Sequence, residues 1–141
     1  MADSGRALQV APYLSFKGDC EAAFQFYARC LGGEVGTLFR YGGSPMSNQA
    51  PEDWQDKVMH GGVTIGGLEL MGADVAPAGY EAPKGFSLSI QSKSVAEAER
   101  IFGELRRDGK VVMPLEKTFW AERFGMVVDR FGIPWLISCE G

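Results

Sequence analysis

Apolar residues recur at helical spacing in two stretches of the chain. Within 23–31 and again within 95–105 they return every three or four positions, which predicts two helices that each bury one face. Asp19 and Ser94 precede these stretches, and both are residue types that cap helix N-termini. The helices are expected to end at the glycines that follow them, which are Gly32, Gly33 and Gly109.

Extended runs surround each predicted helix. In the first half of the chain they cover 11–16, 35–41, 57–65 and 68–74. In the second half they cover 85–91, 111–113, 124–129 and 133–139. The order strand, helix, three strands therefore occurs twice.

The two halves are also related as sequences. Residues 19–27 align with 94–102 at an offset of about 75, with Ala23 on Ala98, Phe26 on Ile101 and Tyr27 on Phe102. A single half has too little apolar surface to cover its own sheet, so we expect one α+β domain over 1–141. It consists of two βαβββ modules with curved mixed sheets around a central cup: module one (7–75), a Pro- and Gly-containing linker (76–84) and module two (85–141).

The Gly66-Gly67 pair is typical of a two-residue hairpin turn. Such a turn pairs Ile65 with Leu68, Thr64 with Glu69 and Gly62 with Met71. One face of the hairpin then carries His60, Gly62, Thr64, Glu69 and Met71, and the other carries Met59, Val63, Ile65, Leu68 and Leu70. We expect the apolar face to receive a helix and the mixed face to line the cup.

Several stretches in register resemble the vicinal-oxygen-chelate (glyoxalase and bleomycin-resistance) superfamily, in its PhnB-like branch labelled 3-demethylubiquinone-9 3-methyltransferase. The matching stretches are 12–27, 51–60, 64–67, 119–120, 129–132 and Trp135. The resemblance implies two tandem modules that form one cup. Because this fold hosts isomerases, dioxygenases, thiol transferases and drug-sequestering proteins, the function has to be argued from the site.

Metal-using relatives place a His or Glu on the first and last strand of each module. In this sequence those positions fall at Pro12 or Tyr13, Glu69, Ser87 and Leu136. Glu69 is the only natural metal ligand among them, and the chain has one histidine in all. Divalent ions in proteins usually take three or more such ligands, so we expect no metal and no other cofactor.

The candidate site residues divide into chemical and lining groups. Glu69 and His60 are the candidates for proton transfer, and a buried carboxylate would suit a general base. The candidates for ligand contact are Thr64, Met71, Ser87, Phe119, Trp120 and Phe124, the three aromatic residues as a wall for a flat apolar ligand. Each has a structural alternative, as a satisfied sheet residue or as core. The loop over 42–56, with Trp54, is either a lid or an ordinary surface loop.

Charge and cysteine content limit the classes of partner and the cellular location that we expect. The net charge is −4 and no basic run is present, which argues against nucleic acid. No apolar stretch approaches the ~20 residues of a membrane span, and the N-terminus lacks the pattern of a signal peptide. Three cysteines without metal-binding spacing predict reduced, buried thiols and a cytoplasmic protein. The resemblance further implies a homodimer.

Two functions remain open from the sequence. The first is metal-independent binding of a small molecule in the cup. The second is a metal-dependent or Glu/His-based lyase, isomerase or dioxygenase that acts on a small carbonyl or aromatic substrate. Methyl transfer is disfavoured, because the chain lacks a doubly wound βαβ unit with a glycine-rich turn for an adenosyl cofactor.

Overall fold

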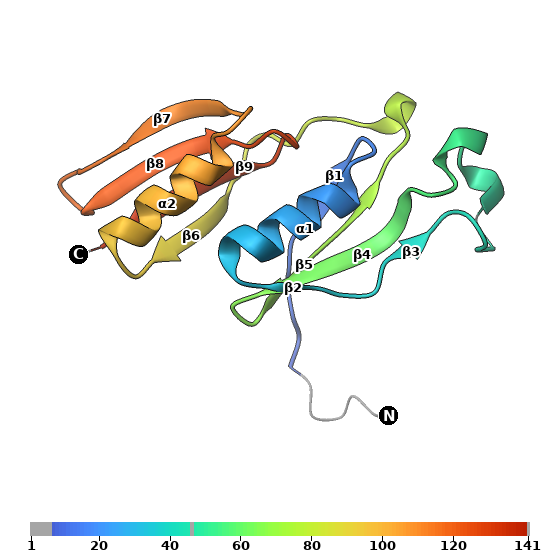
Figure 1. Cartoon of the computed structure of the whole chain (residues 1–141), viewed down its shortest axis with the longest axis horizontal. Coiled ribbons are helices and arrows are strands. Elements are labelled where there is room, and N and C mark those ends of the chain that lie inside the picture. Colours follow the sequence, from blue (N-terminus) through green and yellow to red (C-terminus); the bar gives the residue numbers. More distant parts are fainter. Residues whose placement is uncertain (1–6, 46, 141) are drawn as a thin grey trace.

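The computed structural model describes residues 7–45 and 47–140, and it contains the same arrangement of elements twice (Figure 1). Module one consists of β1 (Tyr13–Phe16), α1 (Cys20–Leu31), β2 (Glu34–Val35), β3 (Phe39–Arg40), β4 (Val58–Ile65) and β5 (Leu68–Asp74). Module two consists of β6 (Leu88–Ser92), α2 (Val95–Leu105), β7 (Lys110–Glu116), β8 (Arg123–Val128) and β9 (Pro134–Cys139). Short 3₁₀ turns lie at Ser47–Gln49, Glu52–Trp54 and Pro77–Gly79.

The two sheets have equivalent strand orders. Module one forms β1-β5-β4-β2, with β3 added on β4, and module two forms β6-β9-β8-β7. In each sheet the first strand is parallel to the last, and the other pairs are antiparallel. The predicted pair of βαβββ modules with mixed sheets is thus confirmed.

The hairpin of β4 and β5 has the predicted register. Gly66 and Gly67 both take positive φ angles, 56° and 84°, as a two-residue turn of this kind requires. Ile65 pairs with Leu68, Thr64 with Glu69 and Gly62 with Met71. Val63 and Leu70 are buried in the core together with residues of α1, so the apolar face receives the helix as predicted.

Two strand predictions differ from the structure. The predicted strand 35–41 is divided into β2 and β3, because the chain leaves the sheet between them and lays Leu38 against Gly61. The predicted run 111–113 is longer and continues as β7 to Glu116. Register shifts in β7 accommodate Pro114, which is tolerated because β7 is an edge strand.

The helix ends confirm part of the prediction. Ser94 caps α2 by accepting a hydrogen bond from the Glu97 amide, and Gly32 closes α1 in the left-handed conformation. Asp19, however, makes no capping bond with its side chain. After α2 the left-handed position is held by Asp108, one residue before the predicted Gly109.

A buried carboxylate joins the two modules. Asp129, in the turn between β8 and β9, is 3% exposed and accepts hydrogen bonds from the Tyr27 hydroxyl of α1 and from Trp135 Nε1. Its other oxygen accepts the amides of Phe131 and Ile133. With four donors, this acceptor offsets the cost of burying a charge.

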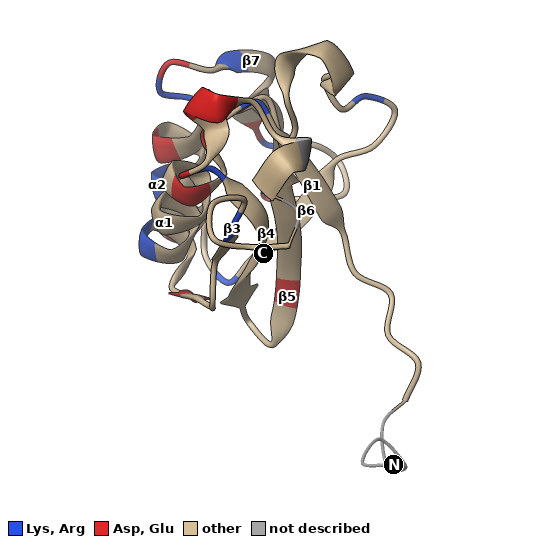
Figure 2. Cartoon of the chain, turned by 90° about the vertical axis from the view of Figure 1, so that its right-hand side faces the viewer, with Lys and Arg blue, Asp and Glu red and all other residues tan. Residues whose placement is uncertain are grey.

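Both helices lie on the same side of the sheets. Figure 1 shows both helices in front of the strands, and Figure 2 shows α1 and α2 together at the left, with β1, β5 and β6 to their right. No helix covers the opposite sheet faces within 7–45 and 47–140. We call these uncovered surfaces the open face of each sheet. Nor does any helix in the described part of the chain have both the length and the apolarity to cross a bilayer.

Candidate functional site

Three aromatic rings stand side by side on the open face of the first sheet. Tyr13 of β1 and His60 of β4 are stacked, with ring centroids 5.7 Å apart and an interplanar angle of 24°. Phe39 of β3, which pairs with His60, lies 6.3 Å from the imidazole at 31°. Tyr13 and Phe39 are 52% and 53% exposed. We call Tyr13, His60 and Phe39 the ring ladder; it offers a flat apolar surface to a ligand.

A hydrogen bond fixes the imidazole within the ring ladder. Tyr13 Oη lies 3.1 Å from His60 Nδ1. Partial burial, with smaller effects from Cys20 and Tyr41, raises the pKa of Tyr13, so the phenol keeps its proton near neutral pH. The hydroxyl can therefore donate to Nδ1 in the imidazole tautomer that carries its proton on Nε2, and it can accept from Nδ1 in the other tautomer. Sequence reasoning had noted Tyr13 only as a family ligand position, because this contact joins residues far apart in the chain.

Glu69 lies next to the ring ladder on the same open face. A Cβ added at Gly62 would come within 2.6 Å of Glu69 Oε2, so the glutamate side chain extends over Gly62. Thr64 pairs with Glu69, and Met71 pairs with Gly62 and with Tyr13. The structure thus groups His60, Thr64, Glu69 and Met71 as predicted. The Glu69 side chain is exposed in the single chain, so it lacks the burial that we expected of a general base.

The residues of the predicted aromatic wall lie in module two, Phe119 and Trp120 in the loop between β7 and β8 and Phe124 on β8. The centroid of the Trp120 ring lies 4.8 Å from that of Phe119 and 5.2 Å from that of Phe124, and both pairs meet edge to face. Thr118 Oγ1 holds the loop by accepting the amides of Trp120 and Ala121. Phe119 is 97% exposed, so it is not a core residue in the single chain. Apart from Ser87, the predicted site residues therefore form two groups, one in each module.

A cavity of about 600 Å³ lies between the modules. We call it the seam cavity. Its apolar wall includes Leu31, Ile65, Leu68, Ile90, Ile101 and Trp135. Ser87 is the one predicted site residue that lines it. No local sequence pattern predicts this cavity, because its walls come from both modules and meet only in the folded chain.

The described residues contain no cluster of three His, Cys, Asp or Glu side chains that could hold a metal ion. The three cysteines are free and buried. Burial raises the pKa of Cys30 to about 11 and that of Cys20 further, which disfavours the thiolate that metals bind.

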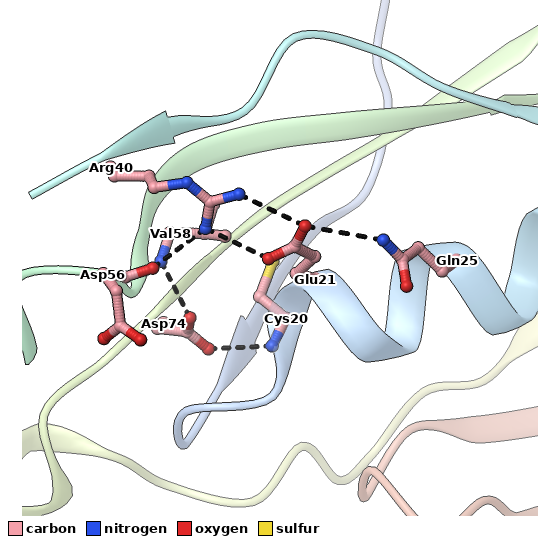
Figure 3. A network of polar contacts seen from close by, with 7 residues as sticks. All are labelled: Cys20, Glu21, Gln25, Arg40, Asp56, Val58 and Asp74. Atoms are coloured by element: carbon pink, nitrogen blue, oxygen red, sulfur yellow. Dashed lines mark hydrogen bonds and ion pairs between the residues drawn. The ribbon is translucent and has the colours of Figure 1, made fainter.

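A polar network at the start of α1 supports the first sheet (Figure 3). Arg40 of β3 donates to both carboxylate oxygens of Glu21, at 3.0 and 3.2 Å, and to the Asp56 carbonyl. Asp74 accepts the amides of Gly18, Cys20 and Val58, and it thereby does the capping expected of Asp19. These bonds tie β3, which carries Phe39, to the helix and fix one end of the ring ladder.

Trp54 anchors the 42–56 loop. The side chain is buried, and its ring lies within 4 Å of a Cβ placed at Gly18. The end of the loop that carries Trp54 is therefore held against module one. Whether the rest of the loop acts as a lid stays a prediction.

Comparisons with known proteins cover nearly the whole chain. The family model described as 3-demethylubiquinone-9 3-methyltransferase matches residues 8–138. Protein YjdN of Escherichia coli (strain K12) is 37% identical, over 93% of this chain and 95% of the relative. The crystal structure of protein PA1353 from Pseudomonas aeruginosa is 47% identical, with a TM-score of 0.85 and coverage of 95% and 98%.

More distant structures share the fold. A Bacillus cereus protein described as a putative 3-demethylubiquinone-9 3-methyltransferase, PhnB protein, is 23% identical, with a TM-score of 0.81 over 94% of this chain and 99% of that chain. A glyoxylase/bleomycin resistance protein/dioxygenase domain from Frankia sp. EAN1pec is 12% identical, with a TM-score of 0.65 over 97% and 100%. The chain therefore belongs to the family described as 3-demethylubiquinone-9 3-methyltransferase, and it shares its fold with the glyoxylase/bleomycin resistance protein/dioxygenase domain.

Proposed function

We propose that this protein binds a flat organic molecule on the open faces of its sheets without a metal ion. The observation that carries the proposal is the ring ladder, because it combines exposed aromatic area with one oriented imidazole. Aromatic faces bind planar ligands with little loss of side-chain entropy. When Tyr13 donates to Nδ1, His60 carries a proton on Nε2, and this hydrogen-bond donor suits a ligand with a carbonyl oxygen.

A second copy of the chain completes the proposed site. Large apolar side chains remain exposed on or beside the open faces: Tyr13, Phe39, Phe86, Met113, Phe119 and Trp120. Exposed apolar surface of this kind marks interaction sites. In a homodimer, the open faces would be covered and the ligand enclosed between them. Free buried cysteines agree with a cytoplasmic location for this dimer.

The second candidate function is proton transfer by Glu69 and His60. It is favoured by the position of Glu69 over Gly62, on the same face as the imidazole. Enclosure in a dimer would supply the burial that a catalytic carboxylate needs. We do not propose methyl transfer. An adenosyl cofactor would need a glycine-rich turn from a strand to a helix, whereas the Gly66-Gly67 turn joins two antiparallel strands.

Calorimetric titration with two matched ketones tests the binding proposal. Acetophenone has an aromatic ring and a carbonyl, and methyl cyclohexyl ketone keeps the carbonyl without the aromatic ring. We expect acetophenone to bind about 2- to 12-fold more tightly, from stacking worth about 0.5–1.5 kcal/mol. His60→Phe should keep the stacking and lose the hydrogen bond, whereas His60→Ala should lose both.

Equal affinity for the two ketones, or binding unchanged in His60→Ala, would contradict the proposed site. If Glu69 acts as a base, Glu69→Gln should leave acetophenone binding within twofold and abolish any turnover of a carbonyl substrate. Weaker binding in Glu69→Gln would instead assign the carboxylate to ligand contact.

A further inference from the structure

We propose that the seam cavity is a second ligand site, which takes a medium-chain carboxylate. The hydrocarbon chain would lie between the hairpin of module one and α2, with the carboxylate at Lys93. This inference does not depend on the proposed function, because the ring ladder and the seam cavity share no residue.

The internal repeat explains why the cavity is empty of side chains. In module two the β8–β9 turn carries Phe131, which packs at 6.0 Å against both Phe26 and Tyr27 of α1. At the related place, the β4–β5 turn of module one has Gly66 and Gly67. The residue of α2 that matches Phe26 in the repeat is the smaller Ile101. Two aromatic rings thus fill one of the related positions, and the other remains a cavity.

The size and lining of the cavity suit an alkyl chain. A volume of about 600 Å³ lies inside the range of roughly 300–1,000 Å³ that small-molecule sites occupy. Leu31, Ile65, Leu68 and Ile101 offer aliphatic contacts, and Trp135 adds an aromatic wall. A mostly apolar cavity with a few polar groups at one side selects amphipathic ligands.

The polar side of the cavity favours an anionic head group. Glu97 accepts hydrogen bonds from Ser92 Oγ at 2.9 Å and from the Lys93 amide at 3.0 Å. These bonds lower the pKa of Glu97 and satisfy its charge locally. The Lys93 ammonium also contributes to the lowered pKa of Glu97, but it forms no ion pair within 4.0 Å among the residues that the structure describes. Ser89 and Gln91 also line the cavity, and their side chains can donate hydrogen bonds.

Titration calorimetry with octanoate and decanoate tests the site, and 1-octanol serves as the neutral control. We expect one site per chain and about fourfold tighter binding for each added methylene, or about 15-fold from octanoate to decanoate. Octanol should bind less tightly than octanoate in the wild type. Lys93→Gln should remove that difference, and Lys110→Gln, on the far edge of the second sheet, should keep it.

Two substitutions that fill the seam cavity with a larger side chain test whether the ligand binds there. Ile101→Phe copies the residue of the related helix, and Leu68→Trp adds bulk at a half-exposed position where folding is not at risk. Both should abolish decanoate binding with melting temperatures at or above that of the wild type. His60→Ala should bind decanoate normally, so a failure of the ring ladder and a failure of the seam cavity would be told apart.

Three results would overturn the inference. The first is no decanoate binding up to millimolar concentration. The second is unchanged binding in both filled variants, which would place the ligand elsewhere. The third is decanoate binding that dissociates a dimer in size-exclusion chromatography, which would assign the cavity to a segment of a second copy.

Discussion

The buried carboxylate of Asp129 offers a strong test of how the modules are held together. We predict that Asp129→Asn destabilises the protein more than Tyr27→Phe, which removes one of the hydrogen bonds to this carboxylate. Each oxygen of Asp129 accepts two hydrogen bonds, Oδ1 from the Phe131 and Ile133 amides and Oδ2 from Tyr27 and Trp135. Asparagine has one acceptor oxygen, so its amide group must face two buried donors.

The magnitude follows from the number of donors that are left without an acceptor. A buried donor without a partner costs about 1–3 kcal/mol, so Asp129→Asn should cost about 2–6 kcal/mol of unfolding free energy. Tyr27→Phe removes one bond to a charged group and should cost about 2 kcal/mol. Tyr41→Phe is the control, because its hydroxyl donates to a neutral carbonyl, that of Asp74, at a partly exposed place. Its loss should cost about 1 kcal/mol or less.

Urea unfolding at pH 7, followed by tryptophan fluorescence and far-UV circular dichroism, measures these differences. The expected order of destabilisation is Asp129→Asn, then Tyr27→Phe, then Tyr41→Phe. A loss of unfolding free energy below ~1 kcal/mol in Asp129→Asn, or below that of Tyr27→Phe, would contradict this account. The four hydrogen bonds to the carboxylate would then not hold the modules together.

Three further predictions concern single positions. Burial, with Asp74 and Asp129 nearby, raises the pKa of Asp19 above its usual 3.8, and one of its oxygens has no partner among the described residues. Ionisation of Asp19 therefore lowers the stability of the native state as pH rises above that value. Asp19→Asn should raise the melting temperature at pH 7, and this gain should shrink as pH falls below 4. An equal gain at both pH values would refute this prediction. Gly103→Ala, in an exposed part of α2 with open space around a Cβ, should raise stability by about 1 kcal/mol in urea unfolding. Gly67→Ala should lower it by about 1 kcal/mol because of the positive φ, and a neutral result would count against the turn.

Local patterns predicted much of the fold. The register of the β4–β5 hairpin followed from a glycine pair and a period of two, and the helix faces followed from a period of three to four. The helix caps were harder, because the group that caps α1 is Asp74, which lies on a distant strand. The same reason hid the role of Asp129, whose partner Tyr27 lies 102 positions away in the chain.

The candidate site was predicted in parts. His60, Thr64, Glu69 and Met71 share one face because strand alternation places them there. The stacking of Tyr13 on His60 crosses from β1 to β4, and no local period reports such a contact. The seam cavity arises from a departure from symmetry between the repeats, at Ile101 and the Gly66-Gly67 turn, which only the packing of the two modules makes visible.

The most direct test of the proposed function uses the one histidine of the chain. In untagged protein labelled with ¹⁵N-histidine, the ring nitrogens report on His60 alone. We predict that the Nε2 resonance shifts when acetophenone is added, because the proposal places a proton on Nε2 that the ketone oxygen accepts. Tyr13→Phe should change the balance of the two tautomers. Ring nitrogens that do not move at saturating ketone, in protein that still binds it, would contradict the claim that the ligand lies on the ring ladder.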